Sequence, residues 1–102
     1  MNGMNMGKMM QQVQQIRNKM RNDQDQINKK KFVGKSPEDL VTVTFTGNHK
    51  MQSMKINQKA MDSKDADMLS DLIISAVNDA LKQIDVTTKN TLGKYTQNIP
   101  KM

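Results

Sequence analysis

The sequence lacks cysteine and tryptophan and has a single histidine among its 102 residues. Without cysteine the chain can form no disulfide and no zinc–thiolate site, and it has no thiol nucleophile. His49 stands beside Asn48 and Lys50 and reads as an ordinary turn residue. The acidic residues fit no calcium-loop spacing, and Glu38–Asp39 has no partnering acid, base or nucleophile. We therefore expect no catalytic residue, no metal, no cofactor and no small-molecule substrate, and so not an enzyme.

Apolar residues make up 35% of the chain and aromatic residues only 3%. The longest apolar stretch, residues 72–77, is interrupted by Ser75 and is far shorter than the roughly 20 residues of a membrane-spanning helix. Residues 1–10 are broken by Asn, Gly and Lys, unlike the apolar core of a signal peptide. We expect a soluble, cytoplasmic protein without membrane contact. A domain so small and polar buries little surface alone, which favours oligomerisation.

Positive charge dominates, because 16 Lys and Arg residues face 10 Asp and Glu residues, for a net charge of +6. Residues 1–35 hold eight basic and two acidic residues, whereas residues 36–102 hold eight of each. The entire excess therefore belongs to the first third of the chain. Such a concentration of positive charge points to an anionic partner.

The basic third reads as one long helix from about residue 4 to residue 28, and residues 1–29 form a projecting basic unit. Its apolar residues recur at spacings of three and four, the heptad pattern of a coiled-coil seam. This stripe is narrower than the one a globular core normally receives from a helix. We expect the helix to project from the body and to pair with another helix. The predicted dimer seam consists of Met6, Met9, Val13, Ile16, Met20 and Ile27.

Residues 30–57 are predicted to form a three-stranded antiparallel meander. Residues 32–33 form a short first strand, and 34–39 read as a loop because of their Gly, Pro and acidic residues. Residues 40–46 alternate apolar residues with Thr, the pattern of a half-buried strand. Residues 47–49 read as a tight turn, since Gly and Asn tolerate positive φ. In the third strand, 50–56, Met51 is out of parity with the other apolar residues, which a β-bulge would accommodate.

Residues 62–95 are predicted to form a C-terminal helix packed on the sheet, followed by a tail at 96–102. Asp62 or Ser63 suits the N-cap, and Asp65 and Asp67 suit the positive end of the helix dipole. Apolar residues spaced by three and four form a wide stripe that should lie on the sheet: Met68, Leu69, Leu72, Ile73, Ala76, Val77, Ala80, Leu81 and Ile84.

This order of helix, three strands and helix resembles the YbaB/EbfC family of bacterial nucleoid-associated proteins. The resemblance covers about residues 6–84 and is carried by stretches 6–14 (MGKMMQQVQ), 41–47 (VTVTFTG), 54–57 (MKIN) and 68–81 (MLSDLIISAVNDAL). The last stretch looks like the family's leucine-aspartate-leucine segment followed by its alanine, asparagine, aspartate and alanine signature. The resemblance implies an intertwined homodimer of a single α+β domain, with projecting N-terminal helices that bind DNA with little sequence preference.

The candidate DNA contacts are the basic residues of the first third: Lys8, Arg17, Lys19, Arg21, Lys29, Lys30, Lys31 and Lys35. The chain has 14 Lys and only 2 Arg. Arg is the residue that most often reads base edges, whereas Lys is a point charge suited to phosphate oxygens. Few aromatic residues are present to stack on bases. We expect phosphate contacts with double-stranded DNA in the bacterial nucleoid.

Two alternatives stay open from the sequence alone. Lys19 and Asp23, and likewise Arg21 and Asp25, stand four residues apart and could pair within the helix, which would leave less charge for DNA. The heptad seam could instead dock a helix of another protein. The chain would then be a non-enzymatic protein-interaction module, with its charge serving only solubility.

Overall fold

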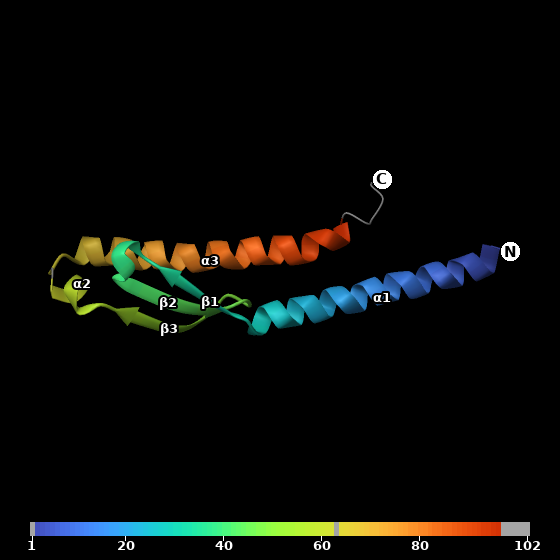
Figure 1. Cartoon of the computed structure of the whole chain (residues 1–102), viewed down its shortest axis with the longest axis horizontal. Coiled ribbons are helices and arrows are strands. Elements are labelled where there is room, and N and C mark those ends of the chain that lie inside the picture. Colours follow the sequence, from blue (N-terminus) through green and yellow to red (C-terminus); the bar gives the residue numbers. More distant parts are fainter. Residues whose placement is uncertain (1, 63, 97–102) are drawn as a thin grey trace.

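The computed structural model describes residues 2–62 and 64–96. A 28-residue helix, α1 (Asn2–Lys29), comes first, and a 31-residue helix, α3 (Ala66–Thr96), comes last (Figure 1). Between them lie the strands β1 (Lys31–Lys35), β2 (Val41–Thr46) and β3 (Lys50–Ile56), with a 3-10 helix, η1 (Pro37–Asp39), before β2 and a short helix, α2 (Gln58–Asp62), after β3. The predicted α+β class and the order of its main elements are confirmed, and η1 and α2 are additions to that order.

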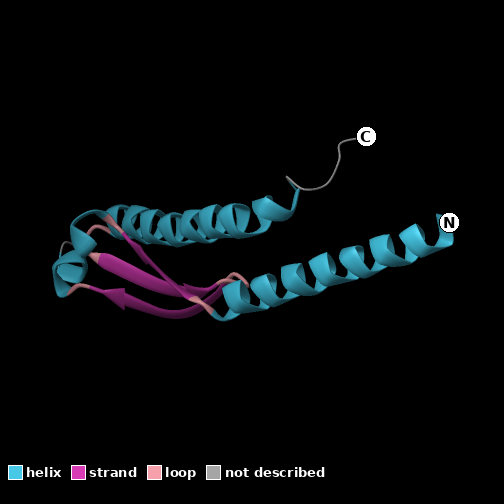
Figure 2. Ribbon diagram, turned by 45° about the vertical axis from the view of Figure 1, so that its right-hand side comes forward, coloured by secondary structure: helices cyan, strands magenta, loops and turns pink. Residues whose placement is uncertain are grey.

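The strands form one antiparallel sheet in the order β1-β2-β3 (Figure 2). The pairing of β2 with β3 shifts by one residue, because Thr44 pairs with Ser53 while Phe45 pairs with Met51. Gln52 is the extra residue of this β-bulge. The bulge returns Met51 to the face that the other apolar residues of β3 occupy. The β-bulge therefore explains why Met51 is out of step with the other apolar residues of β3 in the sequence.

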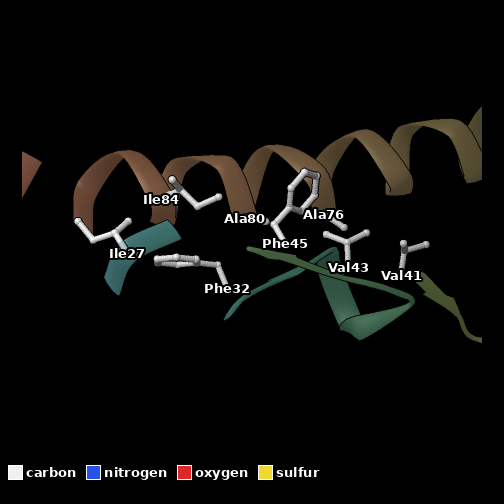
Figure 3. Packing of buried hydrophobic residues seen from close by; sticks show 8 residues of the cluster. All are labelled: Ile27, Phe32, Val41, Val43, Phe45, Ala76, Ala80 and Ile84. Carbon is white, nitrogen blue, oxygen red and sulfur yellow. The ribbon is translucent and has the colours of Figure 1, made fainter. Parts of the chain in front are cut away.

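The core lies between the sheet and α3. The alternate residues of β2 are buried and point towards the helix (Figure 3). The predicted stripe of α3 supplies the other side, with three residues fully buried and five more packed around them. The buried cluster consists of Ile27, Phe32, Val41, Val43, Phe45, Ala76, Ala80 and Ile84.

β1 is longer than predicted, because Gly34 continues the strand instead of opening the loop. Gly34 pairs with Val43 and lies against α3 at two fully buried alanines. A Cβ built on Gly34 would lie 2.2 Å from the carbonyl oxygen of Ala76 and 2.7 Å from the Cβ of Ala80. The absence of a side chain at Gly34 therefore lets the strand and the helix approach closely.

The outer edge of β1 is covered by side chains of α3. The backbone N–H of Lys35 donates a hydrogen bond of 2.9 Å to Asp79 Oδ2, and Gln83 Nε2 donates one of 2.8 Å to the carbonyl oxygen of Val33. An edge strand otherwise exposes such backbone groups to pairing with another strand. α3 thus lies over β1 and β2, with which it makes its main contacts to the sheet, and it leaves β3 exposed.

The turn between β2 and β3 has a different geometry from the predicted one. His49 is the residue with positive φ, at 66°, and none of the described glycines has positive φ. Gly47 is needed for space instead, since a Cβ there would lie 1.9 Å from the carbonyl oxygen of Ile27. Its N–H also donates a hydrogen bond of 3.1 Å to the carbonyl oxygen of Lys30. The turn therefore packs directly against the C-terminal end of α1.

The C-terminal helix begins later than the predicted residue 62. Asp62 is the last residue of α2, so it does not cap the long helix, and Ser63 lies outside the described residues. α3 begins at Ala66, and the backbone N–H of Met68 donates a hydrogen bond of 3.0 Å to Asp65 Oδ1. Asp65 is therefore the N-cap, three residues beyond Asp62 and two beyond Ser63, the two predicted positions.

The other end of α3 is close to the prediction. The helix runs to Thr96, the first residue of the predicted tail, and residues 97–102 lie outside the described part of the chain.

Candidate nucleic-acid interface

The N-terminal part of α1 projects away from the sheet and past the end of α3 (Figures 1 and 2). We call residues 2–21 the arm. Met6 and Met9 are each 63% exposed and Val13 is 47% exposed, whereas Ile16 and Met20 are half-buried. The last turns of α1 behave differently, because Ile27 is buried in the core of the body. One helix thus serves two purposes, as an anchor at its C-terminal end and as a free arm at its N-terminal end.

Asp23 fastens α1 to the C-terminal turns of α3. Its carboxylate accepts a hydrogen bond from the Tyr95 hydroxyl, and Lys94 Nζ lies 3.2 Å from the same oxygen. The Tyr95 hydrogen bond, supported by Lys94, lowers the pKa of Asp23, and the contacts with Asp23 raise the pKa of both Lys94 and Tyr95. The cluster therefore favours charged Asp23, charged Lys94 and neutral Tyr95 around neutral pH. It links the middle of α1 to the last turns of α3.

The basic residues of the arm flank its apolar seam on both sides. At 3.6 residues per turn, Arg17 and Arg21 lie on one side of the seam, and Lys8 and Lys19 lie on the other. All four side chains are exposed. The arm therefore presents an apolar line between two basic edges.

The arm's cations are not neutralised by the acidic residues four positions along the helix. Asp23, the predicted partner of Lys19, is bound to Lys94 and Tyr95 instead. Neither Lys19 nor Arg21 forms a salt bridge with any residue that the structure describes. The pairing of Lys19 with Asp23 and of Arg21 with Asp25, which the spacing left open, is therefore absent.

The remaining candidate cations lie where α1 meets the sheet. Lys29 is the last residue of α1, Lys30 places its Nζ 5.6 Å from the centroid of the Phe32 ring, and Lys31 and Lys35 are the exposed ends of β1. Lys35 also faces Asp39, with its Nζ 4.0 Å from the carboxylate. The eight predicted residues therefore do not form one patch, since the arm and the helix exit hold separate groups.

A groove at the helix exit brings in a residue that sequence reasoning missed. It has a volume of about 450 Å³ and is lined by Lys30 and Lys31 on one side and by Lys82 of α3 on the other. Lys82 is about 50 residues away from residues 30–31 in the sequence, so no local pattern indicates that they lie close together. Tyr95 and Lys94 were missed for the same reason, because 72 and 71 residues separate them from Asp23.

The predicted dimer seam is divided by the fold. Ile27 packs into the core of its own chain, so it is not available for a partner. The other members lie along the arm and line two shallow grooves, of about 350 Å³ and 430 Å³. The seam that remains available consists of Met6, Met9, Val13, Ile16 and Met20.

A second uncovered apolar surface lies on β3. Met51, Met54 and Ile56 share the face of the sheet that bears the core, yet they are 41%, 37% and 36% exposed. They remain exposed because α3 crosses β1 and β2 only. We call these three residues the β3 strip.

Within residues 2–62 and 64–96, no three His, Asp or Glu side chains come together in a way that could hold a metal ion. None of the helices in this part of the chain combines the length and the apolar character needed to cross a membrane.

Comparison with known proteins gives a uniform result. The sequence profile of the YbaB/EbfC DNA-binding family matches residues 1–99. A nucleoid-associated protein of Ligilactobacillus salivarius is 49% identical over 100 residues, covering 98% of this chain and 96% of that protein. A nucleoid-associated protein of Enterococcus faecalis is 48% identical over 101 residues, with coverage of 98% and 97%. The crystal structure of an uncharacterized Helicobacter pylori protein has a TM-score of 0.74 at 17% identity, covering 88% of this chain and 95% of that one, so it shows the same fold.

Proposed function

This chain belongs to the YbaB/EbfC DNA-binding family, and from that premise we propose that it is a nucleoid-associated protein that binds duplex DNA as a homodimer. The contacts are made to phosphates with little sequence preference, and they affect DNA conformation, nucleoid organisation or gene expression. Relatives of nearly the same length are named nucleoid-associated proteins, which supports placing this chain in the nucleoid. The protein acts by binding and not by catalysis.

The observation that carries the proposal is the set of exposed cations on the arm that have no acidic partner among the residues the structure describes. Lys8, Arg17, Lys19 and Arg21 project from a helix that stands clear of the body. Two like charges four residues apart, such as Arg17 and Arg21, oppose helix formation by about 0.2–0.5 kcal/mol. A polyanion lying along the arm removes that repulsion. The lysines at the helix exit and Lys82 extend the basic surface towards the body.

The side chains available for base recognition are few. All three aromatic residues of the chain are buried, with Phe32, Phe45 and Tyr95 at most 8% exposed, so none can stack on an unpaired base. The arm carries the chain's only two Arg residues. Lys, the commoner cation here, binds phosphate as a point charge and reads base edges less often than Arg does. These features support binding to the duplex backbone.

The two uncovered apolar surfaces support a homodimer. The seam of the arm has the narrow heptad spacing of a helix that pairs with another helix. The β3 strip is apolar on a face that is covered elsewhere by α3, so a second copy can complete the cover that this chain lacks. A small domain gains stability by burying such surfaces in a partner. The resulting dimer carries two arms and a formal charge of +12.

The test is a gel-shift experiment with several unrelated duplexes across a salt series. If about six phosphates are neutralised, the logarithm of the binding constant falls with the logarithm of the salt concentration with a slope near −5. The duplexes should bind with similar affinity, and a variant with Arg17→Gln and Arg21→Gln should bind more weakly. Equal affinity at about 50 and 300 mM salt would contradict the proposal.

The exposed seam also favours a second candidate, a protein-interaction module that docks a helix of another protein. Light scattering separates the two, because the purified chain should be a dimer if its apolar surfaces serve self-association. A monomer without affinity for DNA would favour the second candidate.

A further inference from the structure

The sheet has a face that none of the described helices covers. Side chains directly opposite each other in an antiparallel sheet lie on the same face, so the strand register shows which residues share it. In two of its rows the pattern across the three strands is Lys-Thr-Lys. We call this surface the outer face, and its residues are Lys31, Val33, Lys35, Thr42, Thr44, Thr46, Lys50, Ser53 and Lys55.

The four lysines mark the corners of this face. Neighbouring strands lie about 4.8 Å apart, so the lysines of β1 and β3 stand about 10 Å apart across the sheet. The two rows are separated by four residues of β1, which is about 13 Å. The major groove of duplex DNA is about 12 Å wide. Flexible lysine side chains on such a frame can therefore reach phosphates on both sides of a groove.

Acidic residues are almost absent from the outer face. None of the three strands contains Asp or Glu. Lys35 lies 4.0 Å from Asp39, which belongs to η1 at the margin of the sheet. Lys50 and Lys55 are exposed and form no salt bridge with any described residue. The three central threonines are half-buried and add hydroxyl groups, which commonly donate hydrogen bonds to phosphate oxygens.

We propose that the outer face is a second surface that contacts the phosphate backbone of duplex DNA, separate from the arm. This inference rests on the proposed function and extends it to the body of the protein. The occupant follows from charge complementarity, because four lysines and a row of hydroxyl groups suit a regular polyanion. Apart from Val33, the face offers no exposed apolar side chain for a protein partner. A protein with two separate DNA-contacting surfaces can hold two duplex segments.

The test compares two double variants that remove equal charge. The first carries Lys50→Gln and Lys55→Gln on the outer face. The matched control carries Lys59→Gln and Lys64→Gln, both exposed residues outside the sheet. Binding to one duplex is measured by fluorescence anisotropy over a salt series. Circular dichroism and light scattering confirm that both variants keep the helix content and the oligomeric state of the unchanged protein.

If the duplex lies on the outer face of one copy in the dimer and each of the two lysines there neutralises one phosphate, the salt slope of the first variant becomes shallower by about 1.8. At about 0.15 M salt this corresponds to roughly 30-fold weaker binding, taking 1 M as the reference. Equal affinity and equal slope in the two double variants would overturn the inference and leave the proposed function standing. If the unchanged protein does not bind duplex DNA, the proposed function and this inference both fail.

Discussion

Replacing Gly34 by alanine should destabilise the protein strongly, although the change adds only one methyl group. The new Cβ would lie 2.2 Å from the carbonyl oxygen of Ala76 and 2.6 Å from the backbone nitrogen of Ala80. Ordinary contacts begin at 3.4 Å, so β1 and α3 would have to separate by about 1.2 Å at this point. Both neighbours are backbone atoms, which no side-chain rotation can move. Overpacking of a core costs about 1–3 kcal/mol, and this contact belongs near about 3 kcal/mol.

Thermal unfolding followed by circular dichroism measures the effect. Protein concentration must be held constant, because association makes Tm depend on it. For a domain of this size, a loss of about 3 kcal/mol lowers Tm by about 12–24 °C. Gly93→Ala in α3 is the matched control, since nothing lies within 4 Å of its Cβ position. Alanine is favoured over glycine in a helix by about 0.5–1 kcal/mol, so this Tm should rise by about 2–8 °C.

The two variants together decide whether the structural reasoning holds. A Gly34→Ala protein that melts within a few degrees of the unchanged chain would refute the close approach of β1 to α3. An equal fall in the Tm of Gly93→Ala would show that any glycine-to-alanine change destabilises the protein, and that the contact between β1 and α3 is not the cause.

Further predictions concern single contacts. Tyr95 is the only tyrosine and tryptophan is absent, so ultraviolet titration follows this side chain alone. Its pKa should lie above the ordinary 10.0 because of the hydrogen bond with Asp23, and Asp23→Asn should return it towards that value. A titration midpoint unaffected by Asp23→Asn would contradict the contact. The lowered pKa of Asp23 means that its contribution to stability is present above pH 3.8 and is lost as pH falls through its folded-state pKa, so acid should lower the Tm of the unchanged chain more than that of Asp23→Asn. The raised pKa of Tyr95 sets the opposite limit, because its contribution is present below pH 10.0 and is lost as pH rises through its folded-state pKa, which melting curves in alkali would detect. Asp65→Ala should cost about 1 kcal/mol in chemical denaturation, whereas Asp65→Asn should keep most of the cap. Gly47→Ala should lower Tm by forcing the turn away from Ile27, and an unchanged Tm would exclude that packing.

Periodicity was sufficient to predict the main elements. The heptad spacing of residues 6–27 predicted α1, and the alternation of Thr with apolar residues predicted β2 and its inner face. The apolar stripe of α3 was predicted from residues that recur every three or four positions, and all of them except Met68 belong to the core or pack against it. These signals are local, since each depends on residues that stand a few positions apart.

The errors fall at positions where distant segments meet. Gly34 was predicted to lie in a loop, and Gly47 was predicted to be needed for a turn with positive φ. In the structure each position must be glycine because the backbone of another element lies too close for a Cβ atom. The cap of α3 was predicted two or three residues too early, because α2 follows β3 and delays the start of the long helix. Short range spacing carries no information about such contacts.

The candidate site also combines local features, which the sequence predicted, with distant contacts, which it did not. The sequence identified the basic helix, but it left open whether Lys19 pairs with Asp23 and Arg21 with Asp25. The structure resolves both pairings, since Asp23 is bound by Lys94 and Tyr95 from α3, and the arm's cations keep their charge available. Burial of Ile27 likewise shortened the predicted seam.

The sequence by itself determined the main helices and strands, the charge asymmetry and the family, because these depend on residue type and short spacing. Only the tertiary structure decided which cations stay unpaired, that Lys82 joins the helix exit, that the β3 strip is uncovered, and that four lysines share the outer face. Those properties depend on strand register and helix placement, which bring together residues far apart in the chain.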